Sequence, residues 1–137
     1  MKVLFNTINF KSSSKTFYNG ENKTTEYYND NNTLTKTVEV DKFERFIDAK
    51  EYSKTGEIIS HMHKEYENEK IVETYKSIFQ EYTRIIRFVK NGEFTHIIEE
   101  YISKTSPEKN YVHESIRDCA NRLVKMICNG KVIELIK

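Results

Sequence analysis

Residues 70–91, KIVETYKSIFQEYTRIIRFVKN, decide the predicted fold. Their apolar side chains recur every three or four residues, which is the spacing of one continuous stripe on an α-helix. The stripe comprises Ile71, Val72, Tyr75, Ile78, Phe79, Tyr82, Ile85, Ile86 and Val89. No Gly, Pro, Asn or Asp interrupts it, and Asn91-Gly92 follows as a helix stop signal. We therefore predict a long helix over about residues 69–90.

Helical spacing continues after Gly92. The apolar positions of residues 93–103 predict a short second helix, and Ser106-Pro107 is a typical start for a third helix over about residues 108–128. This third helix would bury Cys119, and we expect both cysteines, Cys119 and Cys128, to be thiols in a reducing compartment. Asn129-Gly130 ends the helix or forms a hairpin turn, and residues 131–136 suggest a closing strand.

The first 66 residues alternate between apolar and polar side chains, as β-strands do. We predict strands at 2–10, 24–28 and 33–40. Asn19-Gly20 predicts a hairpin with a type I′ turn, in which both central residues need positive φ. Residues 41–66 fit two further strands, with a helix over 41–51 as the alternative. The predicted fold class is thus α+β, with an antiparallel meander over about residues 2–66 packed by the three helices.

The composition indicates one soluble domain spanning residues 1–137, with 37% hydrophobic and 31% charged residues. The first residues lack the apolar core of a signal peptide, and no segment has the length of a membrane span. We expect a cytoplasmic location and no membrane partner. Abundant Lys, Ile, Asn and Glu without Trp suggest a low-GC bacterium or one of its phages.

His61-Met62-His63 is the nearest approach to a metal motif. On a strand the two imidazoles share one face, about 7 Å apart, which two ligands of one ion can manage. Such a site needs a third ligand from elsewhere in the chain, and no HExxH or CxxC motif supports it. A solvated polar strand face is the simpler interpretation. We therefore predict no cofactor and no catalytic residue, and keep a metal-dependent enzyme using His61 and His63 as an alternative function.

Two further groups of side chains suit binding. Basic residues on the predicted helices would form one cationic face for phosphates or an acidic protein, and these are Arg84, Arg87, Lys90, Arg117, Arg122 and Lys125. The alternative is that these cations are ordinary solubilising charges. Hairpin tyrosines, above all Tyr28 and Tyr52, are rigid anchors for protein recognition, although tyrosine also favours strands for packing reasons.

Tyr28 and Tyr52 each precede a turn and then an apolar strand, and they lie 24 residues apart. Two copies are too few to establish a repeat, so we interpret them as ordinary hairpins. By elimination we expect a small binding protein, of the inhibitor, immunity, antitoxin or phage counter-defence type, whose partner is another protein. Nucleic acid bound on the basic helical face is the alternative partner, and a homo-oligomer is a further expectation.

Overall fold

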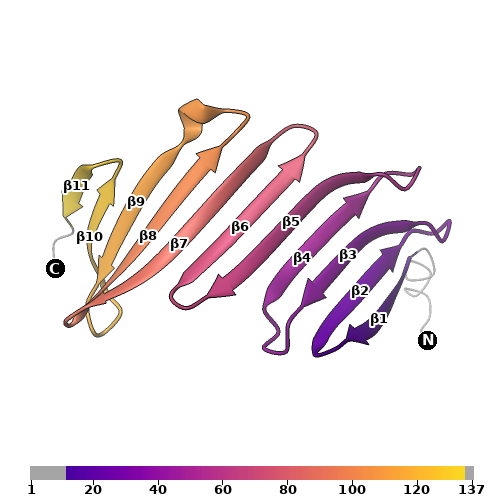
Figure 1. Cartoon of the computed structure of the whole chain (residues 1–137), viewed down its shortest axis with the longest axis horizontal. Coiled ribbons are helices and arrows are strands. Elements are labelled where there is room, and N and C mark those ends of the chain that lie inside the picture. Colours follow the sequence, from indigo (N-terminus) through magenta and orange to yellow (C-terminus); the bar gives the residue numbers. More distant parts are fainter. Residues whose placement is uncertain (1–11, 135–137) are drawn as a thin grey trace, which may run out of the picture. The chain divides into compact units, whose positions relative to one another are not determined.

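The computed structural model describes residues 12–134, and nearly every regular element in that range is a β-strand (Figure 1). The chain divides into two compact units, residues 1–63 and 64–137. The first unit contains β1 (Ser13–Asn19), β2 (Asn22–Tyr28), β3 (Leu34–Val40), β4 (Phe46–Tyr52) and the start of β5 (Ile58–Glu67). Each of these strands pairs antiparallel with the next one along the chain.

The second unit begins with the end of β5 and continues through six more strands and one 3-10 turn. They are β6 (Lys70–Ser77), β7 (Glu81–Asn91), β8 (Phe94–Ser103), η1 (Pro107–Lys109), β9 (Tyr111–Arg117), β10 (Leu123–Cys128) and β11 (Lys131–Glu134). Strands β6 to β11 also form an antiparallel meander. Residues 12–134 contain no α-helix, and no helix in that range is long and apolar enough to cross a membrane.

The α+β prediction is therefore wrong, and the chain is all-β. The predicted helix over 69–90 is the hairpin of β6 and β7, whose tip is Ser77-Ile78-Phe79-Gln80. The predicted helix over 93–103 is β8, and the one over 108–128 is η1, β9 and β10. Both faces of these strands carry apolar side chains, so the alternation typical of strands is lost and a helical spacing arises by chance. Ile78 and Phe79, counted in the apolar stripe, are 75% and 84% exposed at the hairpin tip.

Several of the predicted strands are present in the structure. β2 and β3 lie where strands were expected, and 41–66 forms the two favoured strands, β4 and β5, rather than a helix at 41–51. The closing strand after Asn129-Gly130 is β11, and this hairpin has positive φ at both central residues, as a type I′ turn requires. The Asn19 hairpin is centred one residue later than predicted, since Gly20 and Glu21 are its central residues. The predicted strand at 2–10 lies outside the described residues.

One turn conformation occurs four times, starting at Asn29, Asp41, Ser53 and Asp118. In each copy the first side chain accepts hydrogen bonds from the backbone N–H groups two and four residues on; in the last, Asp118 Oδ1 accepts from Ala120 and Arg122, both at 2.9 Å. The fourth residue has positive φ in every copy, which is the geometry of a type I turn with a glycine-type bulge. The first three copies are 12 residues apart. The spacing of 24 noted in the sequence thus reflects a turn that recurs at half that interval.

Among residues 12–134, no hydrophobic side chain is fully buried. Within each unit the described strands form a single-layer meander, and no second layer of the same unit packs on either face. Stability must come from the backbone ladders and from cross-strand side-chain pairs, each worth about 0.2–1 kcal/mol. The three buried residues in that range are polar, namely Ser60, Glu73 and Ser103. The faces of the sheet are therefore the surfaces to examine for function.

Candidate functional site

The first surface is a group of three side chains on β4 and β5 in the first unit. Asp48 lies directly opposite His63 across the strand pair, and His61 is two residues before His63, so all three project from one face. His61 Nε2 is 2.7 Å from Asp48 Oδ1, and His63 Nδ1 is 3.0 Å from the same oxygen. The structure thus places His61 and His63 together, with ring centroids 6.4 Å apart, and adds a carboxylate that the sequence analysis missed.

The second surface is the face of the second unit that carries Tyr75, Tyr82, Tyr101 and Tyr111, which we call the tyrosine face. These four rings form a ladder across β6 to β9, with neighbouring centroids 5.0–5.3 Å apart, and His113 continues it at 4.2 Å from Tyr111. Tyr82, Tyr101 and Tyr111 each have a neighbouring ring on both sides. Their ring faces are therefore already occupied by one another.

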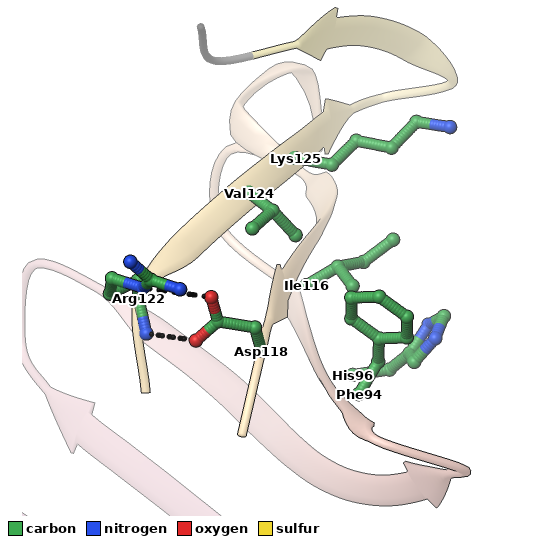
Figure 2. A pocket seen from close by; sticks show the side chains of 7 residues that line it. All are labelled: Phe94, His96, Ile116, Asp118, Arg122, Val124 and Lys125. Atoms are coloured by element: carbon green, nitrogen blue, oxygen red, sulfur yellow. Dashed lines mark hydrogen bonds and ion pairs between the residues drawn. The ribbon is translucent and has the colours of Figure 1, made fainter. Parts of the chain in front are cut away.

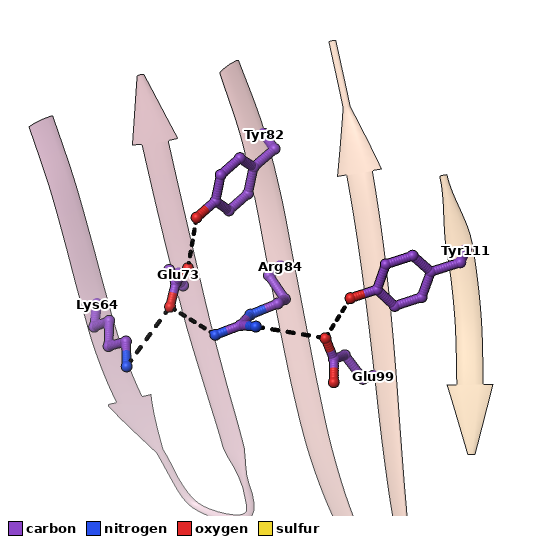
Figure 3. Close-up of polar contacts among 6 residues, drawn as sticks. All are labelled: Lys64, Glu73, Tyr82, Arg84, Glu99 and Tyr111. Atoms are coloured by element: carbon purple, nitrogen blue, oxygen red, sulfur yellow. Dashed lines mark hydrogen bonds and ion pairs between the residues drawn. The ribbon is translucent and has the colours of Figure 1, made fainter. Parts of the chain in front are cut away.

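A chain of charges lies beside this ladder (Figure 3). Glu73 is only 4% exposed, and it accepts hydrogen bonds from the Tyr82 hydroxyl at 2.9 Å and from Arg84 at 3.1 Å. Arg84 also forms an ion pair with Glu99 at 3.6 Å, and Glu99 accepts a hydrogen bond from the Tyr111 hydroxyl. Burial, followed by the hydrogen bond to Glu73, raises the pKa of Tyr82 to about 12. Burial and the bond to Glu99 raise the pKa of Tyr111 to about 12 as well.

The opposite face of the second unit is aliphatic. Alternation along β7, β8, β9 and β11 places five exposed apolar side chains on it, and these are Val89, Phe94, Ile102, Val112 and Val132, each 37–52% exposed. We call this set and its surroundings the aliphatic face. Two pairs of ionisable side chains lie on this face, with Arg87 3.6 Å from Glu100 and His96 hydrogen-bonded to Glu114, and Lys125 lies there as well, opposite Ile116. The aliphatic face therefore combines apolar side chains with two such pairs and one lysine.

One end of the aliphatic face is hollowed, as Figure 2 shows. The hollow has a volume of about 650 Å³ and is open to solvent. It is lined by Phe94, His96, Ile116, Asp118, Arg122, Val124 and Lys125. Arg122 is tied to Asp118 at 2.9 Å across the turn, and its backbone N–H is the first reason that the pKa of Asp118 lies below its usual value. The lining thus consists of three apolar side chains, one fixed ion pair, His96 and Lys125.

The six predicted cations do not share one face, because the helices that were to carry them are strands. Arg84 and Arg87 are three residues apart on β7 and so project from opposite faces. Both are paired with carboxylates, as is Arg122. Arg117 donates to the Asn121 carbonyl, Lys90 is exposed at the end of β7, and Lys125 lines the hollow.

The predicted tyrosines and cysteines lie at turns and strand ends. Tyr28 ends β2, donates to Glu26 at 2.7 Å and has Lys15 5.3 Å from its ring, while Tyr52 ends β4 and is half-buried. Cys119, expected to be buried on a helix, is exposed in the turn that starts at Asp118, and Cys128 is half-buried. Both thiols are free. The sequence predicted individual candidate residues, whereas the structure shows which of them lie on the same face of a strand.

No family model, no curated protein and no solved structure matches this chain. The inhibitor and immunity roles expected from size and composition have no support in these findings, and we do not carry them further.

Proposed function

We propose that this protein acts by binding another protein through the aliphatic face of its second unit. The observation that carries the proposal is the set of five exposed apolar side chains on one face, drawn from four strands. Single exposed apolar residues are ordinary on soluble proteins, but several on one sheet face, with the half-buried Ile98 and Ile116 on the same face between them, favour a contact surface.

The charges on this face favour an apolar partner. Arg87 and His96 are already paired with Glu100 and Glu114, which leaves Lys125 to attract a phosphate backbone on this face. One lysine is too few for the several phosphate contacts on which nucleic-acid binding depends. A partner with a flat apolar surface, such as the face of another sheet, would cover the aliphatic side chains at the usual distance of about 10 Å between packed sheets.

Nucleic-acid binding is less well supported. Single-stranded nucleic acids stack their bases on free aromatic ring faces, whereas the rings of the tyrosine face already stack on one another. The cations proposed for phosphate contact are split between two faces, and three of the six are paired with carboxylates.

The proposal is tested by site-specific photo-crosslinking in the cells that make the protein. Val112 (47% exposed, aliphatic face) is replaced by a benzophenone amino acid, and Ile133 (44% exposed, opposite face) is replaced in a matched control. We expect an adduct with one different polypeptide at Val112 and none at Ile133. A further Ile102→Lys substitution, checked for an unchanged circular dichroism spectrum, should remove that adduct.

Two results would overturn the proposal. Equal adducts at Val112 and Ile133 would show that the face has no special role. An adduct of twice the chain's own mass would show that a second copy, and not a different protein, covers the face.

A further inference from the structure

The side chains of Asp48, His61 and His63 have the composition of a metal site. Their ligand atoms, one carboxylate oxygen and two imidazole nitrogens, all lie within 4.8 Å of one another. Two nitrogens approach the same oxygen, His61 through Nε2 and His63 through Nδ1. These contacts place three potential metal-ligand atoms around one point on the sheet surface.

We propose that Asp48, His61 and His63 bind one divalent transition-metal ion, with zinc as the best match. Two imidazoles and one carboxylate are typical zinc ligands, whereas magnesium and calcium prefer oxygen donors alone. Ligands about 2.0–2.1 Å from a tetrahedral ion are about 3.3 Å apart, so the two rings would turn slightly to open the contacts with Asp48 and close on the ion.

The strand register explains how the three ligands come together. The turn that starts at Ser53 joins β4 to β5 and pairs Tyr52 with Ile58. A one-residue register shift between Tyr52 and Glu51 then sets Asp48 opposite His63 and Lys50 opposite His61. Alternation then brings both histidines to the face of Asp48. The side chains of the three ligands are 18–40% exposed, so an ion can reach them from solvent and a water molecule can complete the coordination.

The neighbouring charges are mixed. Glu39 on β3 lies opposite Asp48 and adds a second carboxylate on the same face, while Asn22 donates to Glu39 at 2.8 Å and holds it. Lys50 is the cation nearest in register. The site is therefore an anionic pair of carboxylates beside two imidazoles, with one lysine at its edge.

The experiment is a titration of the metal-free full chain with Zn²⁺ against a competing chelator, repeated with Mg²⁺. We expect one Zn²⁺ per chain and no Mg²⁺ binding. His61→Gln, His63→Gln and Asp48→Asn should each weaken Zn²⁺ binding by tenfold or more. The matched control is His96→Gln, because His96 is also paired with a carboxylate, Glu114, on a strand face, and it should leave the affinity unchanged.

Cobalt gives a second readout that does not depend on affinity. Co²⁺ bound by this ligand set should show the visible absorption of a four-coordinate ion, and Asp48→Asn should change that spectrum while circular dichroism shows the fold intact. Absence of stoichiometric Zn²⁺ binding would overturn the proposal. An equal loss in His96→Gln and His63→Gln would overturn it too, since the ion would then bind histidines unselectively.

Discussion

Four turns place their fourth residue in the left-handed region of backbone conformation, and one of the four uses glycine there. That glycine is Gly56, and the corresponding residues are Asn32, Glu44 and Asn121. Asparagine tolerates this region, whereas glutamate has no such preference. Glu44, with φ of 64°, is thus the turn residue whose side chain suits its backbone least.

We expect Glu44→Gly to raise the free energy of unfolding by about 0.5–1 kcal/mol, because relief of the left-handed strain exceeds the entropy that glycine gains on unfolding. The substitution also removes an exposed contact with Lys23 at 3.6 Å, which contributes little. Urea denaturation measures the change. Gly56→Ala is the converse variant: no other atom lies within 4 Å of the added methyl group, so backbone strain alone should destabilise it. A destabilised Glu44→Gly would contradict the argument.

Two of the three candidate metal ligands could be predicted from the sequence, and the third could not. Alternation along a strand was enough to place His61 and His63 on one face. Asp48 was missed because its position opposite His63 depends on the register of β4 against β5. That register depends on the turn starting at Ser53 and on the register shift between Glu51 and Tyr52. The Ser-Lys-Thr-Gly signal predicts a turn, but it predicts neither the geometry of the turn nor the shift.

At the scale of elements, the hairpin of β6 and β7 was mistaken for a helix for an identifiable reason. Its tip contains no Gly, Pro, Asn or Asp. The Ser77 side chain stabilises the turn instead, because its hydroxyl oxygen accepts hydrogen bonds from the backbone N–H groups of Phe79 and Gln80. Both strand faces carry apolar residues, so no alternation marked them. The high content of Ile, Val, Tyr and Thr was the available signal for strands, and it was outweighed by the helical spacing.

The tyrosine face should make the second unit sensitive to alkali. Tyr82 and Tyr111 have pKa values raised to about 12, above the usual value of 10, so the folded state favours their protonated forms. This contribution is fully present below pH 10 and is lost as the pH rises from 10 through about 12.

We expect absorbance titration to show Tyr82 and Tyr111 ionising near pH 12, with loss of β-structure by circular dichroism over the same interval. Tyr82→Phe should remove one of these two groups from the titration, whereas Tyr18→Phe, at a residue 73% exposed, should leave both. Ionisation of all tyrosines near pH 10 in the folded protein would contradict this expectation.

At the scale of the whole molecule, the sequence allowed much of the first unit to be predicted and little of the second. Turn signals such as Asn19-Gly20 and Ser53 to Gly56 divided the first unit correctly. The assumption that apolar residues must be buried in a core led to the three helices, since a helix-covered sheet is the usual way to hide them. A chain with no fully buried hydrophobic residue in 12–134 violates that assumption.

The recurring turn allows a deletion to be predicted. Tyr28 and Tyr52 precede equivalent turns and pair in equivalent registers, with Leu34 and Ile58. Removing residues 29–52 joins Tyr28 to Ser53, so that Tyr28 takes the position of Tyr52 opposite Ile58. β2 can then pair with β5, and each of its side chains stays on its original face of the sheet. We expect this variant to fold, as judged by circular dichroism and a cooperative urea transition.

Removing residues 29–51 is the matched control. It leaves one extra residue before the turn and turns each side chain of β2 to the other face relative to β5. This control should be the less stable of the two. Equal stability of the two variants would show that the turn spacing does not set the register.

The absence of a buried hydrophobic side chain from the described residues, 12–134, has a thermodynamic consequence. The heat-capacity change of unfolding grows with the apolar surface newly exposed to water, and in ordinary domains it is about 12–15 cal/mol/K per residue. Strands whose apolar side chains are already in contact with water expose less on unfolding, so this protein should fall below that range. Its stability curve should then be shallow, with cooling and warming changing the free energy of unfolding less than in a protein of the same length built around a core.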